Sequence, residues 1–105
     1  FMEQIMQLIT KHYSDPEFNV NHIIDKIGMS RSVFYSKFKA LSVHSISDLI
    51  TGFRLKKAEE LIRTTTLTIS EIAIECGFND PAYFSRIFKN KYDVSPTEYK
   101  KSYSD

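Results

Sequence analysis

The sequence predicts an all-α fold of seven helices, arranged as two similar halves that a long helix joins. Three observations carry this prediction: apolar residues recur at spacings of three and four, helix caps separate these runs, and one pattern occurs twice. The chain has 105 residues, of which 42% are hydrophobic, with only three glycines and three prolines. This composition fits one packed domain and disfavours a disordered tail or a sandwich of many strands.

Two short helices open the chain. An apolar stripe predicts the first helix over residues 1–13, and the segment Ser14-Asp15-Pro16 ends it. The second is expected to be a short helix of about two turns, whose apolar positions are Val20, Ile23, Ile24 and Ile27. Its predicted N-cap is Asn21 and its predicted stop is Gly28, because these residue types favour the two ends of a helix.

A third helix and a long fourth helix follow. Ser30 is the predicted N-cap of the third helix, which places three apolar residues on one face: Phe34, Phe38 and Leu41. Ser45 and Asp48 have the spacing of a capping box and open the fourth helix. This helix has about 18 residues and is roughly 27 Å long at 1.5 Å per residue. The run Thr64-Thr65-Thr66 is its predicted end.

The pattern of the second and third helices then returns. Four apolar positions after the linker repeat the spacing of the apolar positions in the second helix. They are Ile69, Ile72, Ala73 and Cys76, which correspond to Val20, Ile23, Ile24 and Ile27. Gly77 takes the place of Gly28, and Asp80 before Pro81 starts the next helix. Ser95-Pro96-Thr97-Glu98 is a second capping box, which opens a short last helix through Tyr99.

The offset between the two copies is 49 residues up to the glycine and 50 residues after it. A short helix, a tight turn with glycine and a second helix with one apolar face form a helix-turn-helix. The sequence therefore predicts two tandem helix-turn-helix subdomains, over residues 1–44 and 65–105, with a linker helix over 45–64.

The second helix of each unit carries a stripe of small, polar or basic side chains. Such a stripe lets a helix enter the major groove of DNA, and an arginine on it can contact guanine in a bidentate manner. The two stripes match at offset 50: Ser32, Tyr35, Ser36 and Lys39 in the first unit, and Ala82, Ser85, Arg86 and Lys89 in the second. The alternatives are two solvated helix faces, or an all-helical protein-interaction module that docks these stripes on a partner protein.

These residues also carry a family resemblance. The segment I-S-E-I-A-I-E-C-G-F-N-D-P-A-Y-F-S-R-I-F-K, followed by S-P-T-E-Y, resembles the second helix-turn-helix signature of the AraC/XylS family of transcription regulators. The segments G-M-S-R-S-V-F-Y-S-K-F-K and R-L-K-K-A-E-E-L are similar to the first unit and the linker helix of that family. The N-terminal helix and the S-D-P-E-F-N-V segment resemble the C-terminal output module of hybrid two-component regulators, which are membrane-bound sensors that bind DNA directly.

The resemblance implies sequence-specific binding to double-stranded promoter DNA, with recognition helices at about 31–41 and 81–91 in successive major grooves. By position it adds Arg31 and Pro81 to the groove-facing residues. It implies RNA polymerase as a further partner, a homodimer of the full-length protein, and no small-molecule ligand for this domain. The expected location is the cytoplasm, as a free regulator or as the cytoplasmic portion of a membrane-anchored sensor-regulator.

Four positions depart from the family pattern, and one of them is Ile46, which replaces a common proline at the first position of the fourth helix. Val43 and Asp93 stand where the family commonly has glycine, at a site that favours a left-handed backbone. Asp tolerates that conformation, whereas a β-branched Val does so poorly. Pro81 replaces a longer polar side chain, so Arg86 is expected to carry more of the base reading in the second unit.

No motif predicts an enzyme. There is no nucleophile elbow and no glycine-rich phosphate loop, and a lone Cys76 on an apolar stripe indicates core packing. His12, His22 and His44 lack metal-ligand spacing, so neither a metal nor a cofactor is expected.

The chain has no run of about 18 apolar residues and no basic start of a secretory signal. Because it begins at Phe1, we expect it to be part of a longer protein.

Net charge is only +1, which is low for a partner of nucleic acid. The two groove-facing segments, 29–43 and 79–92, together carry +5, however, and the remainder of the chain carries −4.

Gly52 lies within the linker helix, where glycine costs roughly 1 kcal/mol relative to alanine. It is either a tolerated imperfection or a point of close approach to another helix or to DNA.

Overall fold

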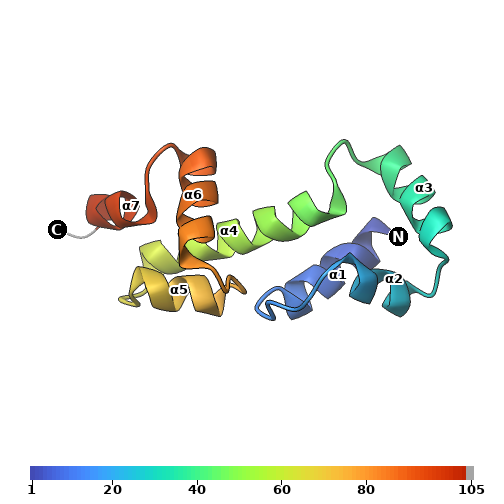
Figure 1. Cartoon of the computed structure of the whole chain (residues 1–105), viewed down its shortest axis with the longest axis horizontal. Coiled ribbons are helices and arrows are strands. Elements are labelled where there is room, and N and C mark those ends of the chain that lie inside the picture. Colours follow the sequence, from blue (N-terminus) through green and yellow to red (C-terminus); the bar gives the residue numbers. More distant parts are fainter. Residues whose placement is uncertain (104–105) are drawn as a thin grey trace.

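The computed structural model describes residues 1–103. This part of the chain forms seven helices and no strand, as the sequence predicts: α1 (Met2–His12), α2 (Val20–Ile27), α3 (Arg31–Leu41), α4 (Ile46–Thr64), α5 (Ile69–Glu75), α6 (Pro81–Tyr92) and α7 (Pro96–Tyr103). The molecule measures 50 × 23 × 22 Å, because α4 runs through its middle with α1 to α3 at one end and α5 to α7 at the other (Figure 1). The last two residues of the predicted second subdomain, 104–105, lie outside the described residues.

Most helices begin at the residue that the sequence predicts. The Ser30 hydroxyl accepts a hydrogen bond from the Val33 amide at 3.3 Å, and the Ser45 hydroxyl accepts one from the Asp48 amide at 3.0 Å. The Asp80 carboxylate accepts from the amides of the two residues after Pro81 at 3.1 and 3.2 Å. These caps satisfy amides that have no partner inside the helix, so they fix where each helix starts.

The prediction for the start of α2 is wrong by two residues. Its N-cap is Asn19, whose side chain accepts a hydrogen bond from the Asn21 amide at 2.9 Å. The amide of Asn19 donates in return to Nδ1 of His22 at 3.2 Å. Asn19 has extended backbone angles, whereas Asn21 is already helical. The reciprocal partner is a histidine, which the usual capping-box pattern with Glu or Gln does not include.

The ends of the two recognition helices differ. Asp93 ends α6 with φ of +68°, as expected of a residue that tolerates the left-handed region. Val43 avoids that region, and Asp93 is the sole non-glycine residue with positive φ among residues 1–103. After Leu41 the chain turns outward at Ser42, which is extended and whose hydroxyl accepts from the His44 amide at 3.1 Å.

Two separate clusters of buried side chains form the core. The first cluster comprises Ile5, Ile9, Phe18, Ile23, Ile24, Phe34, Phe38, Ile46 and Ile50. The second comprises Leu55, Ala58, Ile62, Ile72, Ala73, Cys76, Phe78, Phe84 and Phe88. The first half of α4 thus belongs to one cluster and its second half to the other, so α4 is the structural link between them.

Two apolar positions singled out in the sequence differ in burial. Cys76 is fully buried in the second cluster, and burial raises the pKa of its thiol to about 11. This confirms a packing position. Leu41, in contrast, is 60% exposed, although helical spacing places it on the same side of α3 as Phe34 and Phe38. It is the last residue of α3, and the buried face of that helix stops at Phe38.

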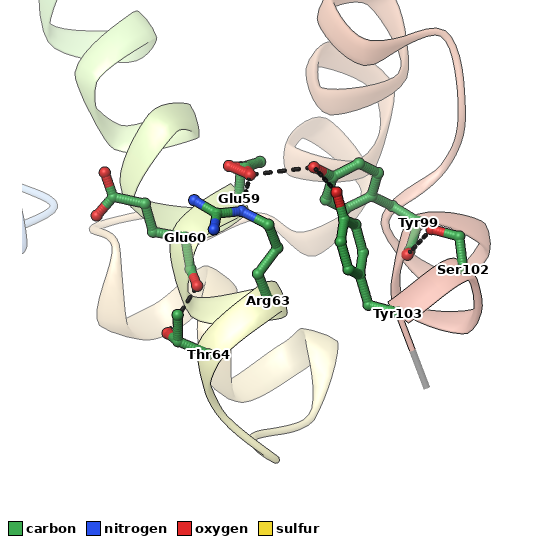
Figure 2. Close-up of polar contacts among 7 residues, drawn as sticks. All are labelled: Glu59, Glu60, Arg63, Thr64, Tyr99, Ser102 and Tyr103. Atoms are coloured by element: carbon green, nitrogen blue, oxygen red, sulfur yellow. Dashed lines mark hydrogen bonds and ion pairs between the residues drawn. The ribbon is translucent and has the colours of Figure 1, made fainter. Parts of the chain in front are cut away.

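A polar network holds α7 against the end of α4 (Figure 2). The Glu59 carboxylate accepts a hydrogen bond from the Tyr99 hydroxyl at 3.0 Å and pairs with Arg63 one turn later. The Tyr99 and Tyr103 hydroxyls are 3.4 Å apart. The hydrogen bond from Arg63 holds the pKa of Glu59 below its ordinary value, and burial raises the pKa of Tyr99. The network therefore fixes the C-terminal helix on the linker.

Candidate nucleic-acid interface

The two helix-turn-helix units are built on the same plan from different local contacts. In the first, Gly28 ends α2 with φ of +78°, and Ser30 begins α3 two residues later. In the second, Gly77 has φ of +88° and Asp80 begins α6 three residues later. The second turn is one residue longer, as the change of offset from 49 to 50 predicts. Both turns end in a strong cap, so each recognition helix starts at a defined point.

Phenylalanine pairs fix which face of each recognition helix is outward. Phe34 and Phe38 anchor α3, and Phe84 and Phe88 anchor α6; all four are 4% exposed or less. At 100° per residue, Ser36 and Arg86 point directly away from these anchors. The packing therefore presents the predicted stripes outward, and Figure 1 shows the two helices at opposite ends of α4.

All ten predicted site residues lie on α3 or α6. Ser85 is half-buried and the others are exposed: Arg31, Ser32, Tyr35, Ser36, Lys39, Pro81, Ala82, Arg86 and Lys89. They form two groups of five, one on each helix, rather than one cluster. An extended site of this kind suits a long ligand that contacts both ends of the molecule.

The site is electropositive and lacks opposing carboxylates. Helix α3 contains no acidic residue, and the single carboxylate of the α6 segment, Asp80, is used as the helix cap. Within residues 1–103, the ion pairs involve Lys57 and Arg63 of α4 and none of the site cations. The cations of the site are therefore available to an anionic ligand.

Each recognition helix orients one arginine over a tyrosine ring. The Arg31 guanidinium lies 5.6 Å from the centre of the Tyr35 ring and donates to the side chain of Asn21 on α2. The Arg86 guanidinium lies 5.3 Å from the centre of the Tyr83 ring, and among residues 1–103 no side-chain hydrogen bond ties it to α5. Arg31 is therefore held by α2, whereas the guanidinium donors of Arg86 are not used for hydrogen bonds within the described part of its own unit.

Sequence reasoning missed two exposed residues of this surface. Val33 is 47% exposed and Tyr83 is 38% exposed, although both are large and apolar. They lie about 60° from the outward direction of Ser36 and Arg86. The repeat contains the signal that could have found them, because Val33 and Tyr83 are equivalent at offset 50.

Two other kinds of site are absent from residues 1–103. Among residues 1–103, no three His, Cys, Asp or Glu side chains are grouped so that they could hold a metal ion. No helix in this part of the chain combines the length and apolar composition needed to cross a membrane.

Comparison with known proteins places the chain in a family. Residues 23–102 match a family described as a helix-turn-helix domain. The xylose operon regulatory protein of Escherichia coli K12 is 36% identical over 97 residues, which cover 92% of this chain and 24% of that protein. Histidine kinase P4 of Formosa agariphila is 29% identical over 104 residues, which cover 99% of this chain and 8% of that protein. The chain thus spans a quarter or less of the length of these curated relatives.

Solved structures agree with this placement. The C-terminal domain of the two-component response regulator yesN from Fusobacterium nucleatum is 31% identical, with a TM-score of 0.86, and the match covers 94% of this chain and 96% of that one. The DNA-binding domain of AdpA, solved with a target DNA, shares the fold at 24% identity with a TM-score of 0.87, over 96% of this chain and 90% of that one. The resemblance read from the sequence is confirmed: the chain belongs to the AraC/XylS-type family of helix-turn-helix DNA-binding domains, which are transcription-regulator modules and not enzymes.

Proposed function

We propose that this domain binds double-stranded promoter DNA sequence-specifically, as the output domain of a transcription regulator, with α3 and α6 in successive major grooves. The observation that carries the proposal is the repeated outward stripe on two helices at opposite ends of one linker. Helix α4 has 19 residues, or roughly 28 Å at 1.5 Å per residue. With a recognition helix at each end, it suits the separation of about 34 Å between successive groove faces.

The proposed contacts divide by chemistry. Arg86 reads guanine, and Ser32, Ser36, Ala82 and Ser85 let the helices approach base edges closely. Arg31, Tyr35, Lys39, Pro81 and Lys89 complete the site, with Lys39 and Lys89 neutralising phosphates. Val33 extends the site, because an exposed apolar side chain on a recognition helix is suited to contact a thymine methyl group.

The test is a mobility-shift titration of the 105-residue chain on a duplex selected from a random library. Log affinity should fall linearly with log salt concentration, with a slope of roughly −0.9 for each phosphate contact. Unselected duplex of equal length is the control, and it should bind much more weakly. If selection yields no enriched sequence and no duplex shifts, the DNA proposal fails and the protein-interaction module takes its place.

The arrangement of the full-length protein follows from the tandem repeat. The two units have different side chains on their stripes and succeed one another along one chain, so each monomer recognises an asymmetric site. A full-length homodimer then favours direct repeats, and footprinting should reveal them. A short palindrome bound by a single monomer would contradict this arrangement.

We infer further partners and boundaries on the same basis. The full-length regulator contacts RNA polymerase beside its promoter site and acts in the cytoplasm, free or as part of a membrane-anchored sensor. This domain binds no small molecule itself. Residues 1–44 and 65–105 are its two subdomains and 45–64 its linker. Co-migration of polymerase with the full-length protein on promoter DNA, and its loss when the promoter site is scrambled, tests the polymerase contact.

A further inference from the structure

One polar junction lies at the middle of α4, where the two hydrophobic clusters separate. Ile50 is the last residue of α4 in the first cluster, and Leu55 is its first residue in the second. Arg54 lies just before that change. Each buried cluster draws its α4 residues from one half of the helix only, so apolar packing alone leaves the two ends of the molecule joined by a single helix.

The Arg54 side chain reaches from α4 to the loop between α1 and α2. Its Nε donates to the carbonyl oxygen of Tyr13 at 2.9 Å. Its Nη2 donates to the carbonyl oxygens of Asp15 at 2.9 Å and Phe18 at 3.3 Å. These three acceptors are bound by two different nitrogens of one planar guanidinium, a fixed fork that the single nitrogen of a lysine ammonium does not reproduce. These bonds fix the loop of the first unit on the linker.

The turn of the second unit meets the same point. A Cβ atom at Gly77 would lie 2.2 Å from the Tyr13 carbonyl oxygen and 2.9 Å from Nε of Arg54. Gly77 belongs to the turn between α5 and α6, so it is part of the second helix-turn-helix. Elements of both units therefore touch Arg54, or the carbonyl group that Arg54 binds.

The junction is adjacent to both recognition units. Phe18 immediately precedes Asn19, which caps α2, and Gly77 lies three residues before Asp80, which caps α6. The junction is therefore continuous along the chain with the start of a helix in each unit. Burial lowers the pKa of the Arg54 guanidinium while the Asp15 carboxylate opposes that shift, as expected for a cation held between packed elements.

We propose that Arg54 is a positioning residue: through the Tyr13–Phe18 loop and Gly77 it fixes the distance and relative rotation of α3 and α6. The consequence for recognition rests on the proposed function. One added base pair between two subsites moves them apart by about 3.4 Å and rotates them by roughly 35°. A rigid pair of helices rejects such a site, whereas a flexible pair tolerates it.

The first test measures the rigidity without DNA. Ala40 and Asn90 are equivalent at offset 50 and both are exposed, so Ala40→Cys and Asn90→Cys carry a pair of spin labels, one on each recognition helix. Cys76 is fully buried and stays unlabelled in the folded chain. Pulsed electron–electron double resonance measures the distance between the two labels. It should give one narrow distance distribution in the labelled parent and a distribution at least twice as wide in Arg54→Met.

Matched variants separate positioning from folding. Lys56→Met makes the same kind of change two residues along α4 at an exposed side chain, and its distribution should equal that of the parent. Arg54→Lys keeps the charge, and the width of its distance distribution should lie between those of the parent and Arg54→Met. If the methionine variant fails to fold, the comparison of parent with Arg54→Lys tests the proposal in its place. Equal widths in parent, Arg54→Lys and Arg54→Met, with unchanged helix content, would overturn the proposal.

The second test measures selectivity for spacing. The selected duplex is compared with duplexes that have one base pair inserted or removed between the subsites. The parent and Lys56→Met should lose at least tenfold in affinity on either change, and Arg54→Met should lose at most threefold. If Arg54→Met loses as much affinity as the parent on the duplexes with altered spacing, Arg54 does not set the selectivity for spacing. If no duplex binds at all, the proposed function fails, while the distance measurement still decides the role of Arg54.

Discussion

Gly77 lies so close to Tyr13 that a methyl group on its Cα would come within 2.2 Å of the Tyr13 carbonyl oxygen. These residues are 64 positions apart and belong to different helix-turn-helix units. The contact shows that the two ends of the molecule are joined at a point beside α4 as well as through it. Only glycine can occupy this position without displacing the neighbouring backbone.

Gly77→Ala should therefore destabilise the domain strongly. The substitution introduces a side chain at φ of +88°, which costs roughly 1–2 kcal/mol in the left-handed region, and it adds a steric clash with backbone. We expect a total loss of more than 2 kcal/mol in the free energy of unfolding, measured by urea denaturation.

Gly28→Ala is the matched control. Gly28 has a similar φ of +78°, but a Cβ atom there would meet nothing within 4 Å. The loss of unfolding free energy in Gly28→Ala should therefore be limited to the conformational cost of roughly 1–2 kcal/mol. Equal losses at the two glycines would show that the approach of Tyr13 contributes nothing.

Gly52→Ala should have the opposite sign. A Cβ atom at Gly52 would also meet nothing within 4 Å, so close approach of another helix does not explain this glycine. Alanine is favoured over glycine inside a helix by roughly 1 kcal/mol. We expect the free energy of unfolding to rise by about that amount, with DNA affinity as a separate readout. Weaker binding by a more stable variant would indicate that DNA approaches the linker here; unchanged binding would indicate a tolerated imperfection.

The sequence predicted the helices well because their signals are local. Apolar spacing and caps such as Ser30, Ser45 and Asp80 act over three or four residues, and the structure confirms them. Asn19 was missed because its capping partner is His22, which departs from the common pattern. Leu41 has the spacing of Phe34 and Phe38 but is exposed, and periodicity alone does not reveal where the neighbouring helices end.

The outward stripes were likewise readable, since they are the complement of the buried phenylalanines. Arg54 was not, because its three acceptors are backbone carbonyls between 36 and 41 residues away. Carbonyl groups carry no sequence signature, so only a structure identifies them as partners.

Val33→Ala should weaken the reading of one thymine. Burial of one methyl group against an apolar side chain is worth about 0.8 kcal/mol, or roughly fourfold in affinity. Replacing single thymines by deoxyuridine in the selected duplex should reveal one position in the first subsite with a loss of about this size. In Val33→Ala that loss should disappear. Val43→Ala is the control, because Val43 is 96% exposed but lies after α3. If no deoxyuridine position distinguishes the two variants, Val33 does not contact a thymine methyl group.

Arg86→Ala and Lys89→Ala should affect binding in different ways. Arg86 points directly outward beside Tyr83, so its loss should relax preference at one base pair, at a cost of roughly 1–3 kcal/mol. Lys89 is proposed to meet phosphate, so its loss should weaken binding to all sequences about equally and reduce the salt slope by about one. Affinities on a panel of single-base variants of the selected duplex distinguish the two patterns. A uniform loss in both variants would remove Arg86 from the base-reading residues.

Glu59→Gln should abolish a pH-dependent part of the stability. The pKa of Glu59 is lowered from its ordinary 4.5, first by the hydrogen bond from Arg63 and also by that from Tyr99. A carboxyl group with a lower pKa in the folded state binds protons more readily when the chain is unfolded. Its contribution is therefore fully present above about pH 4.5 and is lost as the pH falls through the lower folded value. The unfolding free energies of parent and Glu59→Gln should differ at pH 7 and converge below pH 4.5.

Glu75→Gln, at an exposed position on α5, is the control and should follow the parent curve in this range. A difference between parent and Glu59→Gln that stays constant down to pH 3 would show that the Glu59 network contributes through packing rather than through charge.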